Sequence, residues 1–340
     1  MAALRQRAHE RFTIADAADA GAVRRAVGGY ADRAPPTAGR GRGLAELAAT
    51  ELATNLLRHA KPGGWMLTRP IPPSGIELIA VDRGPGIADV PAAVAGRTPN
   101  PKGLGSGLAA VHRASSAFDI HTVPGIGTTV AAVVDLDGTV GWPAHGPLTW
   151  AGVSIGVAEV CGDAWAVTEA DGGLAVAVVD GLGHGPKASV AADAALDAFA
   201  AAPTDLAGFP GRANAAMRAT RGGVVAVCHL RPDDGELDYL AVGNVSGRIV
   251  DGTGQRGLPF HAGTLGLTAR PRRTVPVTYP FPPGATLVLW TDGLRSRVDL
   301  STVDGLFVHH PAVVAATLHR DHTRERDDAT VVVVQHREPP

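Results

Sequence analysis

Apolar and polar positions along the chain follow either the period of an α-helix or the alternation of a β-strand. In the first part, residues 44–60 repeat with the helical period and predict an amphipathic helix. Its expected apolar stripe consists of Leu44, Leu47, Ala48, Leu52 and Leu56. A further helix is predicted over 16–33 and a strand over 76–81. A third helix, 108–117, follows a glycine-rich loop, and another strand begins at 125–129.

The second half is richer in strand patterns. The predicted strands cover 153–160, 174–179, 223–230, 237–242, 248–251, 287–291 and 331–334. Helices are predicted over 187–202 and 206–219, and 252–283 is predicted to be an irregular insertion. This order favours a sandwich of two sheets flanked by helices. The insertion is either a contact site for substrate or partner or a plain surface excursion.

Aspartates recur where the predicted strands of the second half begin or end. Asp180-Gly181 closes one apolar run, and Asp292-Gly293 closes another. Asp327-Asp328 opens a third run, and Asp163 lies upstream in Gly162-Asp163-Ala164-Trp165. A single Asp-Gly pair is typical of an ordinary turn. Their recurrence predicts one metal cluster, and oxygen ligands without a Cys or His cluster favour Mg²⁺ or Mn²⁺ over zinc.

In order and spacing, these motifs resemble the metal-dependent protein phosphatases of the 2C type, in their stage II sporulation E branch. Further matching pieces are Gly183-His184-Gly185 and Gly243-Asn244. The resemblance implies that Asp180 bridges two ions and that the Gly181 carbonyl binds one of them. It implies Asp292 and Asp327 as ligands of the other ion, with Asp328 as an alternative to Asp327, and Asp163 bound through water.

Two bound divalent ions would activate a water for attack on a phosphoserine or phosphothreonine, so Asp180 and Asp292 count as catalytic candidates. His184 is either a general acid or a residue of the helix start. Asn244 either faces the site or serves the backbone of its glycine turn.

The first half contains a second constellation. Glu51 and Asn55 are four residues apart and share one face of the predicted helix, which alone would indicate a surface hydrogen bond. Downstream, a strand ends at Asp82-Arg83-Gly84-Pro85-Gly86, and 102–108 forms a glycine-rich loop before a helix. Backbone N–H groups at such a helix start favour an anion.

Together these elements resemble the ATPase fold of gyrase, Hsp90 and histidine kinases, and within it the anti-sigma serine kinases, over residues 11–136. The resemblance implies that Glu51 is the base, Asn55 the Mg²⁺ ligand, and Asp82 the adenine contact supported by Thr128. It implies pocket and lid roles for Gly84, Gly86, Gly103, Gly105 and Gly107. Lys102 is either a phosphate contact or a solvated lysine. Residues before Leu44 supply no dimerisation hairpin with a phosphoacceptor histidine, which disfavours a conventional histidine kinase.

Composition changes this picture little. The chain has 340 residues, 45% of them hydrophobic, which is enough for two domains. A net charge of −2 without a basic block favours neither nucleic acid nor an anionic membrane as partner. No apolar run has transmembrane length, and the N-terminal residues do not resemble a secretory signal, so we expect a cytoplasmic protein. The two cysteines are expected to be small buried apolar residues.

The sequence therefore predicts an α+β protein. A histidine-kinase-like (Bergerat) ATPase domain is expected over 1–137, a linker over 138–147, and an α-β-β-α phosphatase domain over 148–336. By resemblance, the cofactors are two Mn²⁺ or Mg²⁺ ions and ATP with Mg²⁺. The implied partner is a small STAS-type anti-sigma antagonist, within a larger signalling complex. The ATPase-like domain either opposes the phosphatase as a kinase or regulates it as a nucleotide-responsive module.

Overall fold

Two compact units make up the protein in a computed structural model. The described residues are 4–6, 8–34, 41–61, 63–97, 107–269, 273–295, 298, 300 and 305–338. One unit is His9–Trp142, and the other combines Pro143–Pro340 with Met1–Ala8. Within the described residues, no helix combines the length and hydropathy needed to cross a membrane.

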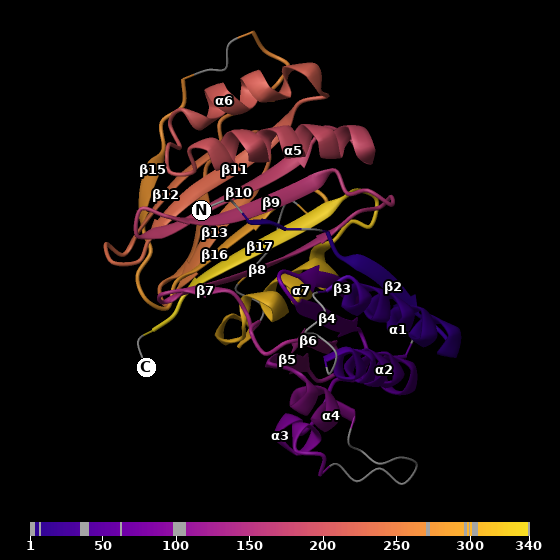
Figure 1. Ribbon diagram of the computed structural model, residues 1–340. Coiled ribbons are helices and arrows are strands. Elements are labelled where there is room, and N and C mark those ends of the chain that lie inside the picture. The colour runs from indigo at the N-terminus through magenta and orange to yellow at the C-terminus, as the bar shows by residue number, and fades with distance from the viewer. Residues whose placement is uncertain are drawn as a thin grey trace. The chain divides into compact units, whose positions relative to one another are not determined.

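The first unit is an antiparallel sheet with helices on one face (Figure 1). Its strand order is β2-β3-β4-β6-β5. The strands are β2 Glu10–Ile14, β3 Gly64–Ile71, β4 Gly75–Asp82, β5 Ala117–Val123 and β6 Gly127–Asp135. The helices are α1 Ala17–Asp32, α2 Gly41–His59, α3 Val90–Val94 and α4 Gly107–Ala114. Side chains from α1, α2 and α4 share one apolar core with the sheet, so the helices can present polar groups at a strand end.

Helix α1 begins where the sequence places its signal, because Asp16 and Asp19 form a reciprocal capping box. Helix α2 differs from the predicted stripe: Leu44 is 43% exposed and Leu47 is 42% exposed. The face that packs is built mainly from alanines together with two of the predicted leucines. Its buried members are Ala45, Ala48, Ala49, Leu52, Ala53 and Leu56. Small residues let α2 approach α1 and the sheet closely. A prediction based only on large apolar residues therefore overlooks this face.

The second unit is a sandwich of two six-stranded sheets. The first sheet has the order β1-β9-β10-β11-β12-β15, and the second has the order β14-β13-β16-β17-β8-β7. The first consists of β1 Leu4–Gln6, β9 Asp163–Ala170, β10 Gly173–Gly181, β11 Gly223–Arg231, β12 Glu236–Val242 and β15 Val277–Pro280. The second consists of β7 Ala144–His145, β8 Leu148–Ile155, β13 Ser246–Asp251, β14 Gly254–Leu258, β16 Thr286–Trp290 and β17 Ala329–His336.

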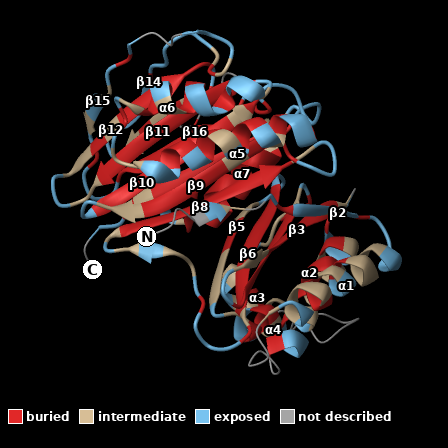
Figure 2. Cartoon of the chain, turned by 45° about the horizontal axis from the view of Figure 1, so that its top comes forward, coloured by how far each residue is buried: buried red, intermediate tan, exposed pale blue. Residues whose placement is uncertain are grey.

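Helices cover the outer faces of this sandwich. Helix α5 Pro186–Ala201 packs on β9 and β10, and α6 Phe209–Ala216 packs on α5. Helix α7 Pro311–His322 packs on β8 and β17. Apolar side chains of both sheets meet in a shared core. Figure 2 shows the central strands as largely buried, whereas the edge strands β14 and β15 are mostly exposed. The predicted α+β class, with a helix-covered sheet followed by an α-β-β-α sandwich, is confirmed.

Two features depart from the expected organisation. The first residues of the chain do not join the first unit, because β1 pairs antiparallel with β9 and covers the edge of the phosphatase-like sheet. The predicted irregular insertion contains two strands: β14 forms a hairpin with β13, and β15 pairs with β12. Each of these strands is hydrogen-bonded to the outer strand of a sheet. A local sequence pattern does not contain that partner strand, so it cannot predict the pairing.

Candidate active site

Two aspartates face each other at one end of the first sheet of the sandwich. Asp163 begins β9 and Asp180 lies near the end of β10, and the antiparallel register makes them direct partners. Cross-strand neighbours of like charge repel each other unless a cation or a proton intervenes. Asp163 is only 6% exposed, so the repulsion acts with little help from solvent.

The second sheet brings further carboxylates to the same end of the sandwich. Asp292 follows β16 and Asp327 precedes β17, and these strands are antiparallel neighbours. The Thr291 hydroxyl ties the two sheets together by donating to Asp163 Oδ2 at 2.7 Å. The same hydroxyl accepts the Thr330 N–H at 2.9 Å. The aspartates of four separate chain segments therefore meet in one place.

This arrangement raises the pKa of both facing carboxyl groups. Burial, together with the charges of Asp328 and Asp292, raises the pKa of Asp163 to about 7, against the hydrogen bonds from Thr291 and Thr330. Burial and the neighbouring aspartates raise the pKa of Asp180 to about 8. Within the described residues, no Lys or Arg forms an ion pair with either carboxylate.

The Asp327-Asp328 pair divides into one exposed and one buried side chain. Asp328 is 3% exposed, and its two carboxylate oxygens accept N–H groups of Val157 and Gly162, at 2.8 and 2.5 Å. Asp328 thereby holds the loop that leads into Asp163. Asp327 is exposed. Asp327 Oδ1 accepts the Asp328 N–H at 3.0 Å, so Asp327 Oδ2 is the one oxygen of the two carboxylates without a hydrogen bond to a described residue.

The turn after Asp180 requires glycine for steric reasons. A Cβ on Gly181 would lie 2.1 Å from the Ala188 carbonyl oxygen in α5, so any side chain there would displace the helix start. His184 is exposed and stands just before Gly185, the residue that caps α5. Its ring forms no hydrogen bond with a described residue. Both the helix-start role and the general-acid role therefore stay predictions.

The side chain of Asn244 contacts one of the aspartates of the site. Its Nδ2 donates to Asp292 Oδ2 at 2.8 Å, which fixes the orientation of that carboxylate. The sequence left open whether Asn244 faces the site or serves its turn. The hydrogen bond shows that it reaches a candidate ligand.

The donor set fits hard divalent cations. The ligand candidates are carboxylates and a backbone carbonyl, the oxygen donors that Mg²⁺ and Mn²⁺ prefer. Among the described residues, no three acidic, His or Cys groups converge closely enough to enclose an ion on their own. Any ion held here would need water to complete its coordination, as is usual for Mg²⁺.

The first unit brings its candidates together in two places. A Cβ on Gly107, at the start of α4, would lie 2.8 Å from Glu51 Oε2 and 3.2 Å from Asn55 Oδ1. Both polar side chains of α2 thus point at the residue that closes the glycine-rich loop. Asp82 Oδ1 accepts the N–H of Gly84 at 2.7 Å and that of Thr128 at 3.2 Å. Gly86 has φ +76°, a conformation suited to glycine.

Three predicted pocket residues, Lys102, Gly103 and Gly105, lie outside the described residues. The sequence also gave no signal for Thr122. Its hydroxyl accepts the Ile87 N–H at 3.0 Å and lies 3.0 Å from the Thr128 hydroxyl. Thr122 therefore links the segment after Asp82 to Thr128, a connection that depends on the pairing of β5 with β6.

His9 has a structural setting in the first unit. Its Nε2 lies 2.9 Å from Glu77 Oε2, and Arg69 Nε donates to the same oxygen at 2.6 Å. Burial favours the neutral acid, but Arg69 and His9 outweigh it and lower the pKa of Glu77 to about 2. His9 is 5% exposed, so its ring is buried within this polar cluster.

Comparison with known proteins decides the family of the second unit. The family model of stage II sporulation protein E (SpoIIE) matches residues 170–337. This segment is a SpoIIE-type phosphatase domain. It belongs with the metal-dependent serine/threonine phosphatases of the 2C type, so the phosphatase part of the fusion recognised from the motifs is confirmed.

The kinase-like region resembles serine/threonine-protein kinase RsbT of Bacillus subtilis (strain 168). The two are 34% identical over 88 residues, which is 25% of this chain and 66% of RsbT. The chain thus spans about two thirds of the length of this relative. The SpoIIE-type domain stands beside a kinase-homologous region.

Two solved structures overlay about half of the chain. A protein described in a study of the bacterial stressosome has a TM-score of 0.50 and 25% identity, covering 55% of this chain and 99% of that one. RsbX in complex with magnesium has a TM-score of 0.49 and 21% identity, covering 58% and 99%. The first of these agrees with the fold assigned to the SpoIIE-type domain.

Proposed function

We propose that this chain is a cytoplasmic signalling enzyme in which a metal-dependent serine/threonine phosphatase is fused to an ATP-binding, serine-kinase-like domain. The observation that supports the phosphatase best is the meeting of Asp163 and Asp180 across two strands, with Asp292 and Asp327 from the other sheet. Such concentrated negative charge, without a described counter-cation, suits bound divalent ions.

In this proposal each residue has a distinct task. Asp180 would hold both ions, and the Gly181 carbonyl would hold one of them. Asp292 and Asp327 would hold the other ion. Asp163 acts through water, and Asp328 holds the loop beneath it. When bound, the ions supply a hydroxide near neutral pH and neutralise the phosphoryl oxygens.

For the first unit we propose ATP with Mg²⁺ as the ligand. Asn55 would bind the ion, Asp82 with Thr128 would contact the adenine, and Glu51 would act as the base toward a serine hydroxyl. The approach of Gly107 to Glu51 and Asn55 supports a shared pocket. The alternative is a module that binds nucleotide only to regulate the phosphatase, with Glu51 orienting the ion.

As substrate we propose a phosphorylated serine or threonine on a small STAS-type anti-sigma antagonist, acting within a larger signalling complex. Support comes from the SpoIIE family match, from the likeness to a serine/threonine-protein kinase, and from the likeness to a stressosome-related structure. Nucleic acid and membrane are not proposed as partners, because the chain carries a net charge of −2 and no basic block.

The decisive experiment measures hydrolysis of para-nitrophenyl phosphate by the full chain with Mn²⁺ or Mg²⁺, with and without ATP. The variant is Asp180→Ala, and the control is Asp233→Ala, an exposed turn residue. We expect activity that requires metal and Asp180 and is unchanged in the control. Activity that survives Asp180→Ala would refute the proposed centre. A change on adding ATP would support regulation by the first unit.

A separate experiment distinguishes the two roles of the first unit. Glu51→Gln is compared with wild type for ATP binding and for phosphotransfer to candidate antagonist proteins. A variant that binds ATP but transfers no phosphate supports catalysis by Glu51. If transfer is absent in both proteins and ATP still alters the phosphatase, the regulatory role holds.

A further inference from the structure

One exposed arginine lies beside the loop that carries Asp180. Arg221 precedes β11, whose first residues pair with the end of β10: Asp180 faces Val224, and Gly181 faces Gly223. The next residue of the loop, Leu182, donates its N–H to the Gly222 carbonyl at 2.9 Å. The backbone of Arg221 is therefore held next to the metal-binding turn.

The side chain of Arg221 reaches over that turn. Its Nη1 would be 2.8 Å from a Cβ placed on Gly183, three residues after Asp180. Gly183 also has φ +85°, so a side chain there would be strained and would collide with the guanidinium. Within the described residues, Arg221 forms no ion pair and no side-chain hydrogen bond. Nearby Arg218, in contrast, donates to the Ala269 carbonyl at 2.7 Å.

The inserted segment fixes the backbone beneath Arg221 from the other side. Leu265 and Gly223 exchange backbone hydrogen bonds of 2.8 and 3.0 Å. A Cβ on Gly222 would lie 2.3 Å from the Leu265 carbonyl oxygen and 3.2 Å from Leu267 Cγ. The same segment reaches the turn of Asn244, because Gly243 donates to the His261 carbonyl at 2.8 Å. Residues 261–267 are thus hydrogen-bonded both to the turn that carries Asn244 and to the strand start that follows Arg221.

We propose that Arg221 binds the phosphoryl group of the substrate. This inference rests on the phosphatase activity proposed above and adds a residue that neither the motifs nor the family match assigns. A phosphate monoester approaching this end of the sandwich meets several carboxylates, which repel it. The planar guanidinium pairs with two phosphate oxygens at once and offsets that repulsion. The glycine at 183 leaves the guanidinium room to lie over the loop.

The test compares wild type, Arg221→Gln, Arg221→Lys and the control Arg256→Gln, an exposed arginine on β14. Para-nitrophenyl phosphate serves as substrate and inorganic phosphate as competitive inhibitor. For Arg221→Gln we expect KM and the phosphate inhibition constant to rise together by roughly tenfold, the effect of losing a charge-assisted contact. Arg221→Lys should recover part of this loss, and Arg256→Gln should match wild type.

Further measurements separate substrate binding from a structural role and from failure of the phosphatase assignment. Mn²⁺ affinity by calorimetry and the melting temperature should be unchanged in Arg221→Gln. If either falls together with activity, Arg221 supports the loop and the proposal is wrong. If KM and phosphate inhibition stay at wild-type values while activity still requires Asp180, only this inference fails. Wild-type activity that is absent, or independent of Asp180, would instead refute the phosphatase itself.

Discussion

At the scale of single residues, the fold holds several carboxylates close together although their negative charges repel one another. Asp163 and Asp180 are opposite each other in register, and burial adds to the cost of charging both. The raised pKa values mean that the metal-free fold holds protons that the unfolded chain would release. A divalent cation would replace those protons, so metal binding should release them and weaken as the pH falls.

Asp180→Asn should stabilise the metal-free protein at pH 8. The pKa of Asp180 is raised from 3.8 to about 8 in the folded state, so its contribution to stability is present below about pH 4 and is lost as the pH rises to about 8. The neutral amide removes this loss, and we expect a melting temperature about 5 °C higher at pH 8. Differential scanning calorimetry across pH 5–8 checks this.

The same variant should lose the rise in melting temperature that Mn²⁺ gives to wild type, because a bridging ligand is gone. Asp233→Ala is the control for both effects. An unchanged metal response in Asp180→Asn would contradict the assignment of Asp180 as a ligand.

Asn244→Ala should weaken metal binding without unfolding the chain. Asn244 Nδ2 orients Asp292 Oδ2, and partners of metal ligands typically contribute 10-fold to 100-fold in affinity. We expect a Kd for Mn²⁺ about tenfold higher by calorimetry. Asn214→Ala is the contrasting variant, because Asn214 holds Gly266 and Thr268 of the insertion. Equal Mn²⁺ affinity in Asn244→Ala and wild type would show that Asp292 is oriented without Asn244.

The sequence could identify the carboxylates because each stands at the end of an apolar run, a signal within a few residues. The resemblance alone favours Asp327 over Asp328. The local sequence cannot explain that preference, because the N–H groups that Asp328 accepts come from Val157 and Gly162, about 170 residues away. Arg221 was missed for the same reason. Its relation to Gly183 exists only once β10 and β11 have paired.

At the scale of elements, the sequence predicts the position of a strand such as β11 better than it predicts which strands pair with each other. Strand β11 was placed within one residue of its observed end, whereas β14 and β15 fell inside a segment expected to be irregular. The sequence of β14 contains two glycines and two polar residues among its five positions, so its apolar pattern is weak. What makes it a strand is hydrogen bonding to β13, which a local pattern does not contain.

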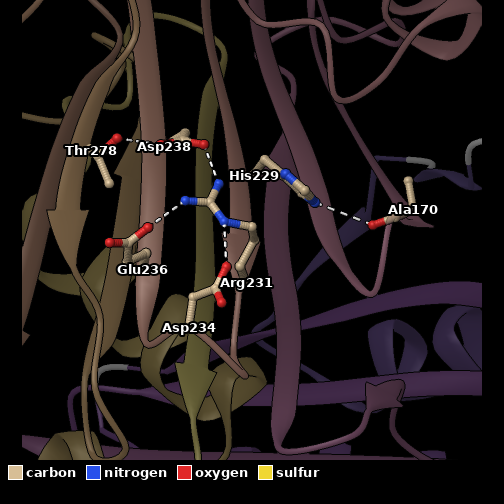
Figure 3. A network of polar contacts seen from close by, with 7 residues as sticks. All are labelled: Ala170, His229, Arg231, Asp234, Glu236, Asp238 and Thr278. Carbon is tan, nitrogen blue, oxygen red and sulfur yellow. Dashed lines mark hydrogen bonds and ion pairs between the residues drawn. The ribbon is translucent and has the colours of Figure 1, made fainter.

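A polar network secures the far end of β11. Arg231 donates to the carboxylates of Asp234, Glu236 and Asp238, and the Thr278 hydroxyl of β15 donates to Asp238 (Figure 3). His229 contacts the Ala170 carbonyl at 3.2 Å on the neighbouring turn. These contacts join β11, β12 and β15 at the end of the sheet opposite Asp180.

Arg231→Ala should therefore lower stability without altering catalysis. Three partly exposed carboxylates lose their common partner, and for such a network we expect a loss of about 1–2 kcal/mol in the free energy of unfolding. Urea denaturation measures the loss, and phosphatase KM should equal that of wild type. Arg256→Ala, an exposed arginine on β14, should cost less. A change in KM would show that the two ends of the sheet are coupled.

At the scale of the whole molecule, the two units do not follow a simple division of the sequence. The expected boundary after residue 137 lies near the observed one at Trp142, but residues 1–8 belong with the second unit. Arg5 in β1 forms ion pairs with Asp193 and Asp197 of α5, so side chains as well as backbone attach this segment. A strand of three residues such as β1 carries no motif that could indicate pairing with β9, more than 150 residues away.

Deletion of residues 1–8 should destabilise the second unit selectively. The edge of β9 loses its backbone partners at Trp165, Ala166 and Val167, so these amides should exchange with deuterium faster than in the full chain. Amides of β4 in the first unit should keep their protection. Deletion of residues 1–3 alone, which leaves β1, is the control. Equal exchange in β9 would show that β1 contributes nothing to the stability of the sheet.

The pairing of β1 with β9 also bears on how the protein is made. Residues 4–6 leave the ribosome before the first unit does, yet their partner strand begins only at Asp163, after the entire first unit has been synthesised. Domains commonly fold in the order in which they emerge, so the first unit can complete its fold while the strand before it is still unpaired. The second unit is then completed by a strand that was synthesised before the first unit. Residues attached ahead of β1, such as a purification tag, would therefore act on the phosphatase-like domain rather than on the kinase-like one that follows them in sequence.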